Sequence, residues 1–92
     1  FCHFPVHPPN VHNLWNAKAV TELLAKYPCV AAYMNGHNHG GNYGQQGNIH
    51  YLTLKGMVDT NTTAYGVVEV HKDRLELKGF GRQKDRTLPL KR

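Results

Sequence analysis

The 92-residue sequence predicts an α/β fold, with a strand, a helix and a second strand followed by an antiparallel meander. Three patterns in the chain lead to this prediction. Residues 16–27 repeat apolar side chains at helical spacing, residues 29–34 form a short continuous apolar run, and the segments after residue 48 alternate polar and apolar side chains. A helix between two apolar segments, with alternating segments after it, is typical of a layered α/β protein.

Residues that end a strand or begin and end a helix indicate where the first strand and the helix lie. The opening residues FCHFPVHPP read as the end of a buried strand that runs into a loop, because Pro5 cannot continue a β ladder. The helix is expected to begin at Asn16, a residue type that can cap a helix N-terminus, and to end before Pro28. Its apolar face is expected to consist of Val20, Leu23, Leu24 and Tyr27.

The strands after the helix fall into two kinds. The run CVAAYM, residues 29–34, suits a strand that is buried on both faces. The segments IHYLTLKGMV, AYGVVEVHKD and RLELKGFG begin at residues 49, 64 and 74, and we expect them to form antiparallel strands with one wetter face. Lys72 and Asp73 are expected to form a tight turn between the last two segments.

Length and cysteine usage limit the class of protein. A chain of 92 residues that is 40% hydrophobic is one small domain or a piece of a larger one, and because it does not begin with Met we expect a fragment. No apolar stretch approaches the roughly 20 residues needed to cross a bilayer, so no membrane partner is expected. Cys2 and Cys29 have apolar neighbours and no CxxC spacing, which favours two buried thiols. The redox compartment stays open, with the cytoplasm favoured.

The charge is unevenly distributed along the chain. The formal net charge is +5, and eight of the eleven basic residues lie between Lys72 and Arg92. We interpret them as solvated strand edges and a basic tail at residues 83–92, which could concentrate an anionic substrate. Nucleic-acid binding is the alternative, but it calls for aromatic side chains among the charges, and this segment has only Phe80. A nucleic-acid partner is therefore not expected.

The stretch MNGHNHGGNYG carries the most informative motif, two histidines one residue apart between an apolar run and a glycine-rich loop. Imidazole is the commonest metal ligand in proteins. On an extended loop, His37 and His39 would point the same way with Cβ atoms about 6.6 Å apart, twice the strand rise, which suits two ions better than one. The alternative is a pair of polar loop histidines without a role.

The topology brings a third histidine to the same place. His3 ends an apolar strand, and successive parallel strands of an α/β sheet present their C-terminal ends to one shared crevice. We therefore expect His3 beside His37 and His39. His7 is close enough in sequence to orient His3 or to touch substrate.

The remaining histidines and the large aromatic residues match no motif position. Structural or solvated positions are expected for His12, His50 and His71. Core positions are expected for Trp15, Tyr27 and Phe80.

Together, HFPVHP and NGHNHGG resemble the last two motifs of the calcineurin-like metallophosphoesterases, a histidine-x-proline and a Gly-His-x-His. The segments GNIHYLTLKGMVDT and RLELKGFGRQKDRTL resemble, more narrowly, the manganese-dependent ADP-ribose/CDP-alcohol diphosphatases. The resemblance runs over nearly the whole chain. It implies that residues 1–92 are the C-terminal portion of a metallophosphoesterase-type αββα sandwich.

The resemblance also implies a set of metal ligands. His3 and His37 would bind one metal and His39 a second, and the two divalent ions would be manganese, with iron or zinc also suited to imidazole. The chain has no Asp or Glu between Glu22 and Asp59. In the family, the bridging Asp, the Asp-x-His pair and the Gly-Asn-His motif lie upstream. The catalytic residues would then belong to an N-terminal part of the same domain, which would be the partner of this chain.

These motifs predict part of a dinuclear-metal phosphohydrolase acting on nucleotide-linked substrates such as ADP-ribose or CDP-alcohols. The loop could supply backbone donors to phosphate, with the tyrosine ring against a base or ribose, from Gly40, Gly41, Asn42 and Tyr43. The alternative for this loop is an ordinary exposed turn. Two other functions stay open: a stand-alone metal-binding or scaffold domain that keeps the histidines without catalysis, and a basic nucleic-acid-binding module.

Overall fold

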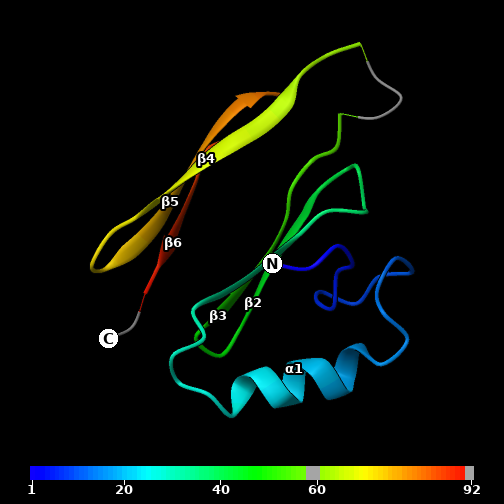
Figure 1. Ribbon diagram of the computed structural model, residues 1–92, viewed down its shortest axis with the longest axis vertical. Coiled ribbons are helices and arrows are strands. Elements are labelled where there is room, and N and C mark those ends of the chain that lie inside the picture. The colour runs from blue at the N-terminus through cyan, green and yellow to red at the C-terminus, as the bar shows by residue number, and fades with distance from the viewer. Residues whose placement is uncertain (58–60, 91–92) are drawn as a thin grey trace.

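The computed structural model describes residues 1–57 and 61–90, and these form one helix and two three-stranded sheets. The elements are α1 (Ala17–Ala25), β1 (Ala32–Asn35), β2 (Asn42–Gln46), β3 (Ile49–Thr53), β4 (Ala64–Val70), β5 (Arg74–Gly81) and β6 (Arg86–Pro89). The first sheet has the order β1-β3-β2 and the second the order β4-β5-β6. Figure 1 shows α1 on one side of the first sheet and the second sheet on the other. The predicted α/β class is confirmed.

Helix α1 begins and ends close to the predicted positions. Asn16 precedes it, but its side chain makes no capping hydrogen bond, and its carbonyl oxygen accepts a 3.2 Å bond from Val20 N–H. Trp15 is 95% exposed, so its predicted core position is wrong, because the helix turns Val20 and Leu24 toward the sheet instead. In the described residues, no helix is long and apolar enough to span a membrane.

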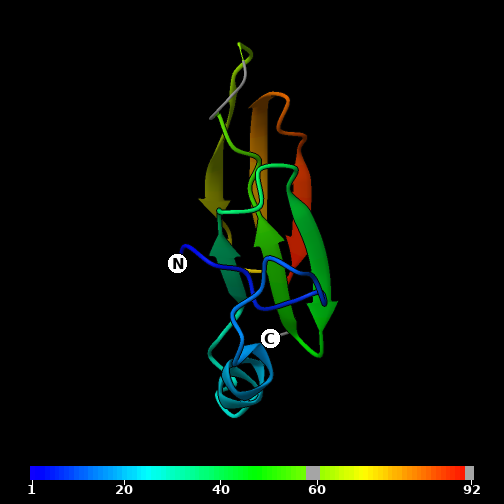
Figure 2. The same ribbon diagram turned by 90° about the vertical axis from the view of Figure 1, so that its right-hand side faces the viewer.

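The first sheet is built around β3, which is buried along its whole length. This strand pairs parallel with β1 and antiparallel with β2, and Figure 2 shows the three strands side by side. The prediction that the segment beginning at residue 49 belongs to the antiparallel meander is therefore wrong. The reason is β2, whose polar, glycine-containing sequence NYGQQ gave no strand signal and which forms a hairpin with β3 through a turn at Gly47, where φ is 60°.

The second sheet contains the predicted hairpin and one strand that was not expected. β4 and β5 pair antiparallel around the predicted turn at Lys72 and Asp73, which is closed by a 2.9 Å bond from His71 N–H to the Arg74 carbonyl. β6 pairs antiparallel with β5. Within the predicted basic tail at residues 83–92, residues 86–89 form a strand, and its Leu88 is fully buried between the sheets. Residues 91 and 92 of the predicted tail lie outside the described part of the chain.

Two apolar clusters hold the three layers together. Side chains of β1 and β3 contribute to both, because successive residues of a strand face opposite sides of a sheet. The cluster between the helix and the first sheet is centred on Val6, Ile49 and Tyr51. The cluster between the two sheets has as its buried members Met34, Leu52, Leu75, Leu77 and Leu88.

Four other side chains that were expected in the interior are exposed: Cys2, Cys29, Tyr27 and Phe80. Cys29 lies in the turn between α1 and β1, where the chain runs along the outside of the fold. Phe80 stacks on Tyr65 across the β4–β5 pair, with ring centroids 4.8 Å apart, on the face turned away from the inter-sheet cluster. Apolar neighbours in sequence therefore did not ensure burial at these positions.

Candidate metal centre

The first segment of the chain lies beside the C-terminal end of β1. Cys2 forms a parallel bridge with Asn35, and Gly36 N–H donates a hydrogen bond to the His3 carbonyl at 3.2 Å. These contacts place His3 next to the turn that follows β1. His37 Nδ1 lies 3.2 Å from His3 Nε2, so the predicted juxtaposition of these two histidines is present.

The separation of the two ring nitrogens fits a shared metal ion. Imidazole nitrogens bind zinc at about 2.0–2.1 Å, so two of them at adjacent corners of a tetrahedron or octahedron lie about 2.9–3.4 Å apart. The observed 3.2 Å lies within this range, and it also allows one ring to donate a hydrogen bond to the other. Imidazole ligands suit manganese, iron or zinc. His3 and His37 therefore fit the predicted metal.

The backbone of His37 adopts an uncommon conformation. Its φ is 65°, in the left-handed region that non-glycine residues seldom occupy and that clusters at functional sites. The preceding residues hold this turn in place. Asn35 is buried; its Nδ2 donates to the Gly36 carbonyl at 2.8 Å, and its Oδ1 accepts a 3.0 Å bond from Thr53 Oγ1. The end of the first sheet thus fixes the turn that carries His37.

Aromatic rings surround His37. The ring of Phe4 lies 4.5 Å from it and the ring of His12 lies 5.5 Å from it, between centroids. Partial desolvation, followed by the neighbouring imidazoles of His3, His12 and His39, lowers the pKa of His37 and favours the neutral ring that binds metals. Sequence reasoning missed His12 as a member of this cluster, because only the return of the loop after residue 5 brings it close.

His39 does not form a group with His3 and His37 in which all the ring nitrogens lie within 4.8 Å of one another, but it is near enough to His37 to contribute to the lowering of its pKa. Its ring packs on Gly56, where an added Cβ would lie 2.8 Å from His39 Cδ2. Gly56 N–H also donates a 3.1 Å hydrogen bond to the His39 carbonyl. This separate position suits the expected assignment of His39 to a second ion, which stays a prediction.

Comparison with known proteins places this geometry in context. No protein-family model matches the chain. It is 39% identical over 92 residues to a manganese-dependent ADP-ribose/CDP-alcohol diphosphatase from Xenopus laevis, covering 94% of this chain and 26% of that relative. The protein of the same name from Homo sapiens is 31% identical over 96 residues, covering 98% of this chain and 28% of the relative.

A solved structure decides the fold. A dimetal phosphatase from Danio rerio matches with a TM-score of 0.89 and 29% identity, over 97% of this chain and 30% of that one. The chain has the fold of part of a dimetal phosphatase. It spans about a quarter of the length of the curated relatives it matches. The resemblance to the diphosphatases inferred from the motifs is confirmed.

The geometry of residues 40–43 alters the expectation for the glycine-rich loop. Gly41 takes φ 76° in a tight turn closed by its N–H bond to the Asn38 carbonyl, and β2 already begins at Asn42. The ring of Tyr43 packs between the two sheets, and its hydroxyl lies 2.8 Å from His50 Nδ1. This packing argues against the predicted contact of the Tyr43 ring with a base or ribose. A phosphate contact from the loop stays a prediction.

The other histidines divide into two groups. His50 is fully buried and joins Tyr43 to the Pro89 carbonyl, so its expected structural position is confirmed. The ring of His7 packs on Tyr51, with centroids 5.0 Å apart. No contact in the described part of the chain supports the expected role of His7 beside the first metal ligand, and that role stays a prediction.

His71 belongs to a small group of possible cation ligands on the β4–β5 hairpin, together with Glu69 and Glu76. Both carboxylates already have cationic partners, since Glu69 pairs with Lys78 at 3.1 Å and Glu76 with Arg74 at 2.7 Å. The pairing with Lys78, followed by that with His71, lowers the pKa of Glu69. The group therefore reads as a surface ion-pair network, and its basic members are not free to attract an anionic substrate.

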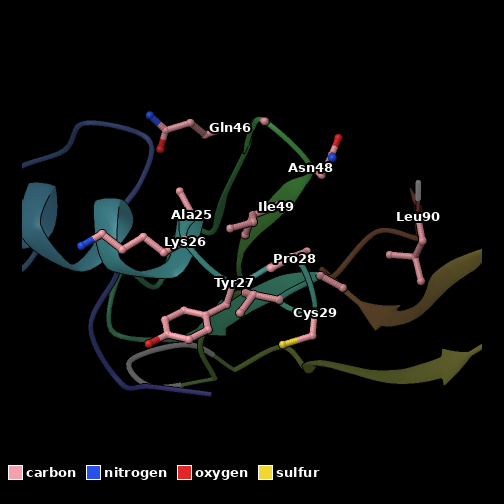
Figure 3. Close-up of a pocket in the computed structure, with 12 residues that line it drawn as sticks. Ala25, Lys26, Tyr27, Pro28, Cys29, Gln46, Asn48, Ile49 and Leu90 are labelled. Carbon is pink, nitrogen blue, oxygen red and sulfur yellow. The ribbon is translucent and has the colours of Figure 1, made fainter. Parts of the chain in front are cut away.

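An open groove of about 950 Å³ lies at the opposite end of the first sheet (Figure 3). It opens at the starts of β1 and β3, whereas His37 and His39 follow the C-terminal end of β1. None of the predicted metal ligands lines it; the lining residues are Ala25, Lys26, Tyr27, Pro28, Cys29, Val30, Ala31, Gln46, Gly47, Asn48, Ile49 and Leu90. The candidate site is therefore the histidine cluster and not the groove.

Proposed function

We propose that this chain is part of a dinuclear-metal phosphohydrolase that cleaves the diphosphate or phosphoester bond of nucleotide-linked substrates such as ADP-ribose or CDP-alcohols. The observation that carries the proposal is the 3.2 Å separation between the ring nitrogens of His3 and His37. The fold shared with a dimetal phosphatase supports two metals, and the names of the relatives support the substrate class and manganese.

The histidines of this chain are proposed as metal ligands. His3 and His37 bind one ion through facing nitrogens, and His39 binds the other from its separate position. The bound ions supply charge neutralisation at the phosphate and an activated water. In this proposal the bridging carboxylate and the catalytic acid come from an N-terminal part of the same domain. In the described residues, the carboxylates that group with possible metal ligands are Glu69 and Glu76, beside His71 on the second sheet.

The test is an assay of the full-length protein with added manganese. ADP-ribose and CDP-choline should each be cleaved at the diphosphate link, with release of a nucleoside monophosphate that chromatography can measure. A His3→Ala variant should lose this activity. Its matched control is His71→Ala, on the hairpin of the second sheet, which should retain activity. Cleavage of simple phosphomonoesters alone would keep the dimetal chemistry and reject the nucleotide-linked substrates.

The two alternatives predict different results in the same experiment. A scaffold domain would bind metal and show no turnover with any phosphate ester. A basic binding module would bind nucleic acid with a steep dependence on salt concentration and would release no product. Two of the basic residues that such a module would use are already paired with carboxylates within the chain, Arg74 with Glu76 and Lys78 with Glu69.

A further inference from the structure

The position of the His39 ring depends on the segment that follows β3. Gly56 forms the wall against which the ring lies: an added Cβ would come within 2.8 Å of Cδ2 and 2.9 Å of Cγ. The same residue holds the backbone of His39 through the 3.1 Å bond from its N–H. Any displacement of Gly56 therefore displaces His39.

The second sheet fixes this segment through two side chains of the turn between β5 and β6. Gln83 is buried, and its Oε1 accepts a 2.9 Å hydrogen bond from Lys55 N–H. The guanidinium of Arg82 donates to the Gly56 carbonyl through a terminal nitrogen. Residues 55 and 56, which lie beyond the end of β3, are thus held from outside the first sheet.

Arg82 is itself anchored on both its backbone and its side chain. Its N–H donates to the Thr63 carbonyl at 2.8 Å, and its Nε donates to Thr62 Oγ1 at 2.9 Å. A planar guanidinium with several donors can make such contacts at once, which a lysine ammonium cannot reproduce in the same geometry. The turn is therefore rigid enough to set the position of Gly56.

We propose that Arg82 and Gln83 are positioning residues for His39, acting through the backbone of residues 55 and 56. The inference rests on the proposed function, in which His39 binds the second ion. Partners that orient a metal ligand typically change metal affinity or activity by about 10–100-fold when they are removed. Loss of either side chain should weaken the ion at His39 and leave the ion at His3 and His37 in place.

The first measurement needs no metal. In the metal-free full-length protein, ring nitrogen and proton NMR signals of the histidines report their surroundings one by one. Arg82→Met and Gln83→Leu should shift or broaden the His39 signals and leave those of His3 unchanged. Gln83→Glu keeps an acceptor oxygen for Lys55 N–H, although it loses the 3.3 Å bond from Gln83 Nε2 to the Lys84 carbonyl, and it should move the His39 signals less than Gln83→Leu does.

The second measurement is a manganese titration of the same variants. Wild type should bind two ions, and Arg82→Met should lower the affinity for one of them by about 10–100-fold. Arg74→Met is the matched control, because this arginine lies on β5 and pairs with Asp73 and Glu76, and it should change neither affinity. Equal losses at both ions would indicate general damage and would overturn the proposal.

The outcomes separate this inference from the proposed function. Unchanged His39 signals in both Arg82→Met and Gln83→Leu would overturn the positioning role whatever the metal content. Fewer than two ions in wild type would overturn the proposed function, while the NMR comparison would still decide whether Arg82 and Gln83 position His39. If Arg82→Met fails to fold, the pair Gln83→Leu and Gln83→Glu decides the question.

Discussion

Replacing His50 with leucine tests how the two sheets are joined. His50 lies on β3 and is fully buried, with Nε2 2.6 Å from the Pro89 carbonyl on β6. A carbonyl oxygen can only accept, so Nε2 donates to it, and Nδ1 makes the 2.8 Å hydrogen bond with the Tyr43 hydroxyl. One imidazole thus bridges a strand of each sheet.

The size of the effect follows from the groups left without partners. Leucine is similar in volume, so the cost comes mainly from the Tyr43 hydroxyl and the Pro89 carbonyl, at about 1–3 kcal/mol for each buried group left unpaired. Since Pro89 is exposed as a residue, its carbonyl can regain water, and we expect a total of about 2–4 kcal/mol. The measurement is made on the full-length protein, whose relatives are about four times as long as this chain, so each kcal/mol should lower Tm by about 2–4 °C at most.

Thermal and urea unfolding of the full-length protein, followed by circular dichroism, measure this loss. Tyr43→Phe removes one of the two contacts and should cost less than His50→Leu, and the double variant should cost less than the sum of the two. His71→Leu, on the outer hairpin, is the control and should change Tm little. A His50→Leu variant as stable as this control would refute the bridging role of His50.

Three further outcomes concern the histidine cluster. His3→Ala, His37→Ala and His39→Ala should each abolish activity of the full-length protein with losses well beyond 100-fold, whereas unaltered turnover in any one of them would remove that residue from the ligand set. His12→Ala was expected to be silent from sequence, but its ring contact with His37 now predicts a loss of about twofold to tenfold in manganese affinity, measured by titration. The 92-residue chain alone should not turn over ADP-ribose, and turnover by the purified chain would contradict the need for an N-terminal part.

The elements that could be predicted from sequence are those whose apolar residues repeat at a helical or strand period. The helix, β1, and the hairpin of β4 and β5 were all visible as apolar patterns, and the histidines stood out because they follow an apolar run. β2 was missed because its residues are polar or glycine, and its stability comes from pairing with β3. Because β2 was not predicted, the position of β3 between β1 and β2 was not predicted either.

The site was predictable only where topology could be inferred. Parallel strands bring their C-terminal ends together, which placed His3 beside His37. The approach of His12 depends on the path of a loop. The packing of His39 on Gly56 depends on the second sheet, whose Arg82 and Gln83 hold the backbone of residues 55 and 56. Spacing in sequence carries no signal for contacts of this kind.

Anomalous diffraction at the manganese absorption edge, from crystals of the full-length protein grown with manganese, tests the proposed metal centre most directly. We predict one peak within bonding distance of both His3 Nε2 and His37 Nδ1, and a second peak at the ring of His39. A map with no peak between His3 and His37, in which the two rings are still hydrogen-bonded to each other, would contradict the assignment of these histidines as metal ligands.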